Sequence, residues 1–245
     1  MNMNNNFLLK IYRRLSYEVD MLKFSPPVGI VYNPLDYAWD GFAQYMRYSY
    51  GVKRVVFLGM NPGPWGMTQT GVPFGEVEAV KNFLGITKIN ITKPENAHIS
   101  RPVQGLDCER SEISGKRLWG LFREKFGTAE NFFAENFVLN YCPLLFTEIT
   151  DKGSLRNITP DKLVQSEREA LCGLCDEALV DVMKILRPDF VVGVGNFAYD
   201  RAKSVLQKPI VITKILHPSP ANPQANHDWQ GKAKRKLIAE GVWTE

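Results

Sequence analysis

Three side chains that can do chemistry lie at the ends of apolar runs in this sequence. Asn61, Asn140 and His217 each end, or closely follow, a short run rich in Val, Ile, Leu or Phe. A side-chain amide offers one hydrogen-bond donor and one acceptor in a plane, which matches the edge of a pyrimidine. An imidazole can donate to an oxygen on which negative charge develops. These residue types indicate a site for a flat heterocycle.

Each of these residues also has an ordinary structural interpretation. Asn61 precedes Pro62, and Asn-Pro is a common turn opener. Asn140 is equally compatible with the cap of a strand end, and His217 with a capped or solvent-exposed histidine. Position makes the functional interpretation about equal to the structural one, because prolines hold both Asn61 and His217 in extended backbone just beyond a buried strand.

The stretch from Gly59 to Glu76 is too irregular for a helix or a strand. It carries five glycines, three prolines, several amides and hydroxyls, and the apolar Met60, Met67 and Phe74. A loop of this length is usually functional, and its prolines and aromatic residues argue against disorder. Phe74 is either a core residue or a platform for a flat ring, and the two methionines are either pocket residues or plain packing.

Four runs rich in Val, Ile, Leu and Phe are predicted to be fully buried strands, and helical patterns lie between them. Such an alternation predicts an α/β fold with a mostly parallel sheet that is covered by helices on both faces. Ligands of such sheets bind beyond the carboxyl ends of the strands, which here carry amides and one imidazole but no acid. The expected strands are 54–59, 136–141, 189–195 and 209–216; the expected helices are 7–24, 39–50, 75–85, 114–126, 160–187, 197–207 and 224–240.

Length and composition predict one domain. Residues 26–245 form the expected α/β domain, and residues 1–25 an N-terminal helical arm. A net charge of +4 favours an anionic partner, and four cysteines without disulfide spacing favour a reducing compartment. We expect no secretory signal and no membrane span, and therefore a cytoplasmic protein, or a nuclear one in a eukaryote.

Several other classes of site are disfavoured. Cys172 and Cys175 sit in one helical pattern without a second pair, so buried thiols are expected there and no metal site. Deaminase zinc motifs and phosphate-binding fingerprints are absent. The basic run 232–236 is either a solvated helix face or a surface for phosphates.

Four motifs resemble those of one family. They are Gly59 to Pro64, Gly71 to Glu76, Asn140 to Leu144 and His217 to Asn226. Together they resemble the single-strand-selective monofunctional uracil-DNA glycosylases, a branch of the uracil-DNA glycosylase superfamily, over roughly residues 30 to 230. The resemblance implies a three-layer α/β/α sandwich with a central four-stranded parallel sheet. It also implies that uracil, 5-hydroxymethyluracil and related oxidised uracils are removed from DNA by hydrolysis of the N-glycosidic bond.

The resemblance also implies roles for individual side chains. Asn61 would position the attacking water and His217 would hydrogen-bond the departing base. Asn140 would read the uracil edge and Phe74 would stack on the ring. A further set would surround the base or hold the DNA. Near the base it contains Met60, Gly63 and Met67, and along the DNA it contains Pro64, Pro218, Ser219, Pro220, Ala221, Asn222 and Asn226.

Two residues depart from the family pattern. Trp65 stands where vertebrate members have Phe, and Ala221 stands where they have an Arg that helps to wedge the duplex, so the wedge is open to question. No lysine lies in the 59–76 loop or in the loop after His217, so a Schiff base with the sugar has no donor and the abasic site should remain intact. Lys214 should lie on the opposite face of its strand from His217. We expect no cofactor, and a monomer that acts on single- and double-stranded DNA.

Three other functions remain open at this point. One is a superfamily member specific for other deaminated bases such as hypoxanthine or xanthine. Another is a non-catalytic protein that binds damaged DNA. The third is an unrelated nucleotide-binding α/β enzyme, which the missing phosphate fingerprint disfavours.

Overall fold

Four parallel strands form the centre of the molecule in a computed structural model that describes residues 3–244. The strand order is β3-β2-β6-β7. Every residue of β2 and β3 is buried, as expected for strands covered on both faces. The four predicted strands are confirmed, each boundary within two residues, at β2 (Val55–Gly59), β3 (Asn136–Asn140), β6 (Phe190–Val194) and β7 (Val211–Ile215).

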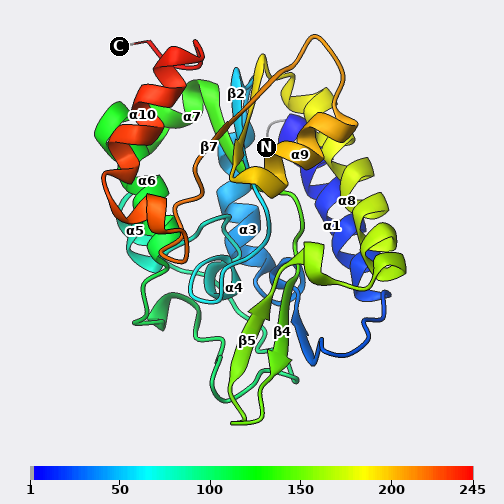
Figure 1. The fold of residues 1–245 in the computed structure, drawn as a ribbon. Helices are drawn as coiled ribbons and strands as arrows, with labels where there is room; N and C mark the ends of the chain where they lie inside the picture. Colours follow the sequence, from blue (N-terminus) through cyan, green and yellow to red (C-terminus); the bar gives the residue numbers. More distant parts are fainter. Residues whose placement is uncertain (1–2, 245) are drawn as a thin grey trace.

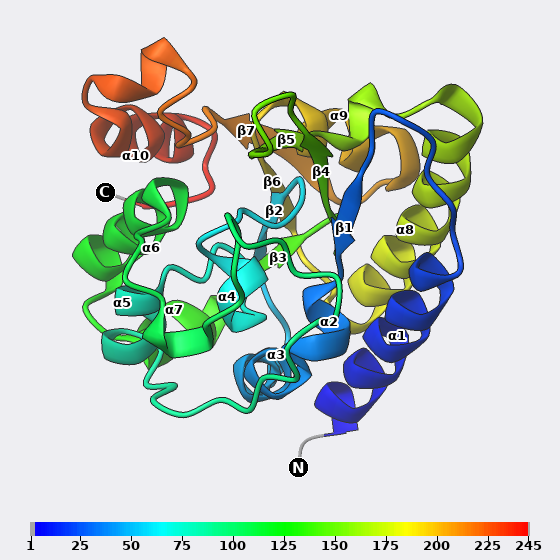
Figure 2. The same cartoon turned by 90° about the horizontal axis from the view of Figure 1, so that it is seen from below.

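Helices cover both faces of this sheet and make three layers (Figures 1 and 2). One layer consists of α1 (Met3–Asp20), α8 (Gln165–Leu186) and α9 (Asn196–Val205). The other consists of α5 (Val77–Asn82), α6 (Ile113–Phe126), α7 (Ala129–Glu135) and α10 (Trp229–Ala239). The three-layer α/β/α prediction is therefore confirmed.

Short helices fill the connections between these layers. One of them protects the sheet, because the Tyr45 hydroxyl in α3 donates to the Val138 carbonyl at 2.7 Å and accepts from the Val138 N–H at 3.2 Å. These bonds occupy backbone groups of the edge strand β3 that would otherwise be open to another chain. The short elements are α2 (Pro34–Tyr37), α3 (Trp39–Met46), α4 (Met67–Thr70), and the 3₁₀ turns Arg47–Ser49, Gly105–Asp107, Pro160–Lys162 and Pro223–Asn226.

The sequence patterns did not reveal a second, antiparallel sheet. Its strands are β1 (Ile30–Tyr32), β4 (Leu145–Ile149) and β5 (Leu155–Ile158), in the order β1-β4-β5. These strands are short and only partly buried, so their apolar pattern is weak. The signal that was present is the turn around Gly153, which has a φ of 70° and joins β4 to β5 as a hairpin.

The N-terminal helix α1 contributes to the main core. Its side chains Leu8, Tyr12, Leu15 and Val19 recur at helical spacing, and all four are buried. In both views α1 runs alongside α8 (Figures 1 and 2). Residues 1–2 of the expected arm lie outside the described residues. Within residues 3–244 none of the helices combines the length and apolar character needed to cross a membrane.

Candidate active site

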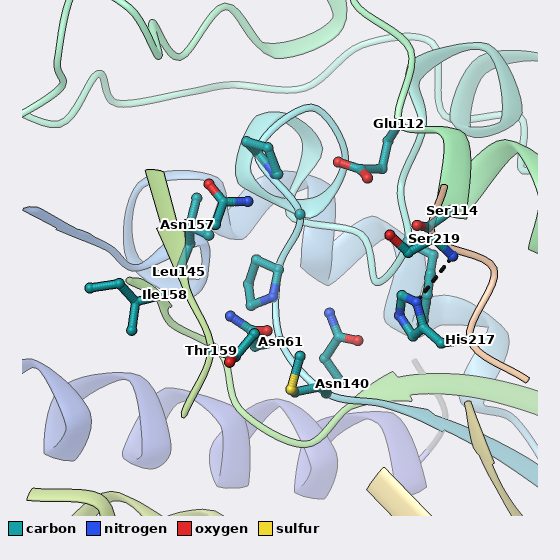
Figure 3. Close-up of a pocket in the computed structure, with 15 residues that line it drawn as sticks. Asn61, Glu112, Ser114, Asn140, Leu145, Asn157, Ile158, Thr159, His217 and Ser219 are labelled. Atoms are coloured by element: carbon teal, nitrogen blue, oxygen red, sulfur yellow. Dashed lines mark hydrogen bonds between the residues drawn. The ribbon is translucent and has the colours of Figure 1, made fainter. Parts of the chain in front are cut away.

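A pocket of about 160 Å³ opens at the carboxyl ends of the central strands (Figure 3). It is smaller than the roughly 300–1,000 Å³ sites that hold drug-sized ligands, so it suits a single ring. Eight of the residues singled out from the sequence meet there, namely Met60, Asn61, Gly63, Pro64, Phe74, Asn140, His217 and Ser219. Asn61 and His217 therefore face one cavity although 156 positions separate them in the chain.

Strand register explains why the two asparagines meet. Gly59 at the end of β2 pairs with Asn140 at the end of β3, and the pairing continues as the Tyr141 N–H donates to the Gly59 carbonyl at 2.9 Å. A Cβ on Gly59 would lie 2.3 Å from the Asn140 side-chain oxygen and 2.5 Å from the Phe74 ring. Only glycine lets the amide and the ring approach the strand end this closely.

The Asn61 side chain is held with its acceptor available. Its amide nitrogen Nδ2 donates to the Leu144 carbonyl at 3.0 Å. This bond fixes the rotation of the amide and leaves Oδ1 as an acceptor at the pocket. An acceptor in this position can orient a water molecule.

Asn140 carries an unsatisfied atom. Its Nδ2 contacts the Met67 sulfur at 3.2 Å, while its Oδ1 is buried and has no hydrogen-bond partner among residues 3–244. An unpaired buried acceptor costs about 1–3 kcal/mol. A ligand N–H in the pocket would remove that cost. Met67 itself is buried and does not line the pocket. It therefore supports the Asn140 amide from outside the pocket.

His217 is a neutral donor in this structure. The Ser219 backbone N–H donates to Nδ1 at 3.1 Å, so Nδ1 must be the unprotonated nitrogen and the proton sits on Nε2 (Figure 3). Burial lowers the pKa of His217 from 6.5 to about 4. The ring therefore presents a neutral N–H near pH 7.

Phe74 forms a flat wall of the pocket and is held in an unusual backbone conformation. Its φ is 54°, in the left-handed region that non-glycine residues rarely adopt. The Trp119 indole N–H donates to the Phe74 carbonyl at 3.2 Å, and the Glu76 N–H donates to the same oxygen at 2.7 Å. The ring centroid lies 6.3 Å from that of His217. Strain that is held in place this way often marks a functional position.

Glu112 corrects the expectation of a site without an acid. This residue caps the start of α6 and lines the pocket, where its Oε2 accepts from the Trp65 N–H at 3.1 Å. Burial raises its pKa. A Cβ on Gly63 would lie 2.4 Å from Oε2, so the loop packs directly on the carboxyl group. Glu112 was missed because it lies in a loop, far from any strand end.

The small sheet supplies the remaining wall of the pocket. Leu145 in β4 and the end of β5 line it opposite Glu112 (Figure 3). These residues could not be found without the hairpin, since nothing in the sequence placed it beside the parallel sheet. The lining residues not foreseen are Pro62, Glu112, Ser114, Leu145, Asn157, Ile158 and Thr159.

The loop after His217 lies mostly outside the pocket. Pro218 is buried, Asn222 is partly buried, and Pro220, Ala221 and Asn226 are exposed. Arg117 in α6 donates to the Pro218 carbonyl at 2.8 Å and to the Asn226 Oδ1 at 3.2 Å. Asn226 Nδ2 donates to the Pro220 carbonyl at 3.0 Å. This loop has a fixed shape, and Arg117 is a support that sequence reasoning missed.

The described pocket lining contains neither a lysine nor a cysteine. Lys214 Nζ donates to Asn196 Oδ1 at 2.9 Å and Lys214 is not part of the pocket lining. Cys172 and Cys175 are buried and unpaired, as predicted. Within residues 3–244, His, Cys, Asp and Glu side chains form no group of three that could hold a metal ion.

Fold and pocket together define a class: an α/β protein with a pocket of single-ring size at the carboxyl edge of a parallel sheet, lined by amides and a neutral imidazole. The family model of the uracil DNA glycosylase superfamily matches residues 48–239, and the chain belongs to that superfamily.

Curated relatives carry a more specific name. The chain is 47% identical to the single-strand selective monofunctional uracil-DNA glycosylase of Rattus norvegicus, over 94% of this chain and 82% of the relative. It is 49% identical to the enzyme of the same name from Bos taurus, over 94% and 84% of the two chains. Among solved structures, wild-type SMUG2 of Pedobacter heparinus aligns with a TM-score of 0.69 over 99% of this chain and 98% of that one. At 18% identity this last likeness shows the fold alone.

Proposed function

We propose that this protein is a monofunctional uracil-DNA glycosylase of base excision repair. It takes an extruded uracil from DNA and hydrolyses the N-glycosidic bond, leaving an abasic site. Family membership and the names of the relatives support this activity. The observation that carries it is the meeting of Asn61, Asn140 and His217 in one pocket of single-ring size.

The pocket explains how uracil is recognised. A base must leave the stack before its glycosidic bond can be attacked, so a snug pocket selects for bases that flip. The unpaired Oδ1 of Asn140 accepts the N3–H of uracil, while its Nδ2 stays on the Met67 sulfur and so fixes the rotation of the amide. Cytosine has no N3–H, so it would leave Oδ1 unpaired. Phe74 provides the face on which the ring stacks.

His217 acts on the departing base and Asn61 acts on the attacking water. Cleavage leaves a uracil anion and an oxocarbenium-like sugar. The Nε2–H of His217 donates to a base oxygen as negative charge develops, which for one such donor contributes on the order of 3 kcal/mol. Asn61 Oδ1 aims a water at the sugar carbon. A weak acceptor suffices because the carbon is already cationic.

Oxidised uracils are the finer part of this proposal. Gly63 and the Glu112 carboxyl group lie at the same wall of the pocket. We assign the 5-position of the base to this wall, where a 5-hydroxymethyl group would find a hydrogen-bond partner that a methyl group cannot use. Pro64, Ser219 and the loop of Pro218, Pro220, Ala221, Asn222 and Asn226 would hold the distorted strand. We further propose that the protein works as a monomer in the cytoplasm, or in the nucleus of a eukaryote.

One experiment tests the activity directly. The protein is incubated with single-stranded DNA that contains one uracil, in EDTA, and free uracil is measured together with alkali-labile sites. Both should appear in equal amount without strand scission before alkali. Asn61→Ala should lose most turnover and keep DNA affinity, since only water positioning is removed. Binding without release of uracil by the unaltered protein would refute the proposal.

A further inference from the structure

Two arginines lie against one partly exposed ring next to the pocket-lining residues. The guanidinium carbon of Arg101 lies 4.8 Å from the centroid of the Trp65 ring, and that of Arg110 lies 4.4 Å from it. Trp65 is partly exposed, as is Arg101, and Arg110 is exposed. Indole attracts cations more strongly than a phenyl ring does, so Trp65 holds both groups in place.

The positive charges of the two arginines are only partly balanced by acids. Within residues 3–244 neither arginine has a carboxylate at ion-pair distance. The two guanidinium groups repel each other, and burial together with this repulsion lowers the pKa of Arg101 against the opposing effect of Tyr32 and Glu112. Glu112 is the nearby acid, but burial raises its pKa and its Oε2 accepts from the Trp65 N–H.

The location of this pair is defined by the loop. Trp65 directly follows Gly63 and Pro64, which line the pocket, and its backbone N–H is bonded to Glu112, which lines the same pocket. Both guanidinium groups therefore lie against a residue that adjoins the pocket lining, although neither arginine is itself among the lining residues. DNA brings a phosphate diester on each side of the extruded base.

We propose that Arg101 and Arg110, held on Trp65, bind one backbone phosphate of a nucleotide next to the extruded one. Guanidinium groups are matched to phosphate oxygens in charge and in hydrogen-bond geometry. This inference rests on the proposed function for the identity of the DNA, and adds a binding site that none of the four family motifs contains.

Arg110→Gln is the cleaner variant, because Arg101 also donates to the Leu155 carbonyl at 3.4 Å. Arg187→Gln is the matched control: it removes the same charge from an exposed residue that directly follows α8 and precedes the amino end of β6, away from the pocket. Single-stranded oligonucleotides with one uracil are prepared with one uncharged methylphosphonate linkage at each of the four positions around the uracil, and kcat/KM is measured for each.

With unmodified DNA, kcat/KM should fall about tenfold in Arg110→Gln and stay unchanged in Arg187→Gln. In the unaltered protein one particular methylphosphonate should cause a similar loss, and in Arg110→Gln that linkage should cause little further loss. Equal additional losses in both proteins at every linkage would overturn the inference.

Salt dependence gives a second readout that needs no turnover. Binding of single-stranded DNA with thymine in place of uracil is measured between 50 and 200 mM salt. Losing one phosphate contact should reduce the slope of log affinity against log salt by about 0.7 in Arg110→Gln. An unchanged slope contradicts the phosphate site even if uracil is released, whereas no release of uracil by the unaltered protein contradicts the proposed function alone.

Discussion

The neutral state of His217 is the part of this mechanism that an experiment can test most directly. The Ser219 N–H occupies Nδ1 and burial lowers the pKa to about 4. At pH 5.5 such a ring is mostly neutral, while a ring with the usual pKa of 6.5 would be roughly nine-tenths protonated. kcat/KM for uracil release should therefore be flat between pH 8 and 5.5, and should fall only near pH 4, where a proton on Nδ1 would face the Ser219 N–H.

The variant His217→Leu gives the magnitude. Loss of one donor to the departing base costs about 3 kcal/mol, which is a roughly hundredfold or greater loss of kcat. His98→Leu is the matched control, since His98 is bonded to Ser100 and lies outside the pocket. The assay is release of free uracil from single-stranded DNA across the pH range. A step in kcat/KM centred near pH 6.5 that disappears in His217→Leu would refute the neutral-donor argument, and a near-normal rate in that variant would remove the residue from the mechanism.

Three further perturbations test the supports of the site. Trp119→Phe keeps a ring but loses the bond to the Phe74 carbonyl and leaves a cavity, so it should raise KM and lower the free energy of unfolding by at least about 1 kcal/mol, measured by urea denaturation. Arg117→Ala releases the loop after the catalytic histidine and should speed its amide exchange and raise KM, while Arg123→Ala on the same helix should change neither. Lys53 is fully buried, donates to a backbone carbonyl and has its pKa lowered to about 8 by burial. Between pH 8 and 10.5 the unfolded chain binds more protons at this lysine, so the unaltered protein should gain up to about 3 kcal/mol of stability over Lys53→Met as pH rises, and a constant difference would contradict the lowered pKa.

The parallel sheet could be predicted because strands that are buried on both faces have a nearly continuous apolar sequence. Runs such as Val55 to Gly59 are continuous, apolar and β-branched, so both their existence and their type were readable. The rule that ligands lie beyond the carboxyl ends of such strands then placed Asn61, Asn140 and His217 together.

The rest of the pocket depends on contacts that leave no local pattern. Glu112 is an ordinary charged residue before a helix, and only the packing of Gly63 on its carboxyl group brings it to the site. The β4 and β5 strands are short and only partly buried, so the part of the pocket wall that they form could not be predicted either. Met67 was correctly expected near the other site residues. Its contact with the Asn140 amide depends on side-chain packing, which sequence spacing does not reveal.

The position of Trp65 beside the pocket allows binding to be followed by the intrinsic fluorescence of the protein. Of the five tryptophans, Trp119, Trp229 and Trp243 are at most 4% exposed, and Trp39 is partly buried beneath the guanidinium group of Arg13. Of the five, Trp65 is the one that belongs to the pocket loop, and its ring lies against two cations. Intrinsic fluorescence should therefore change when a nucleic acid strand reaches this loop, and binding kinetics can be followed without attaching a dye.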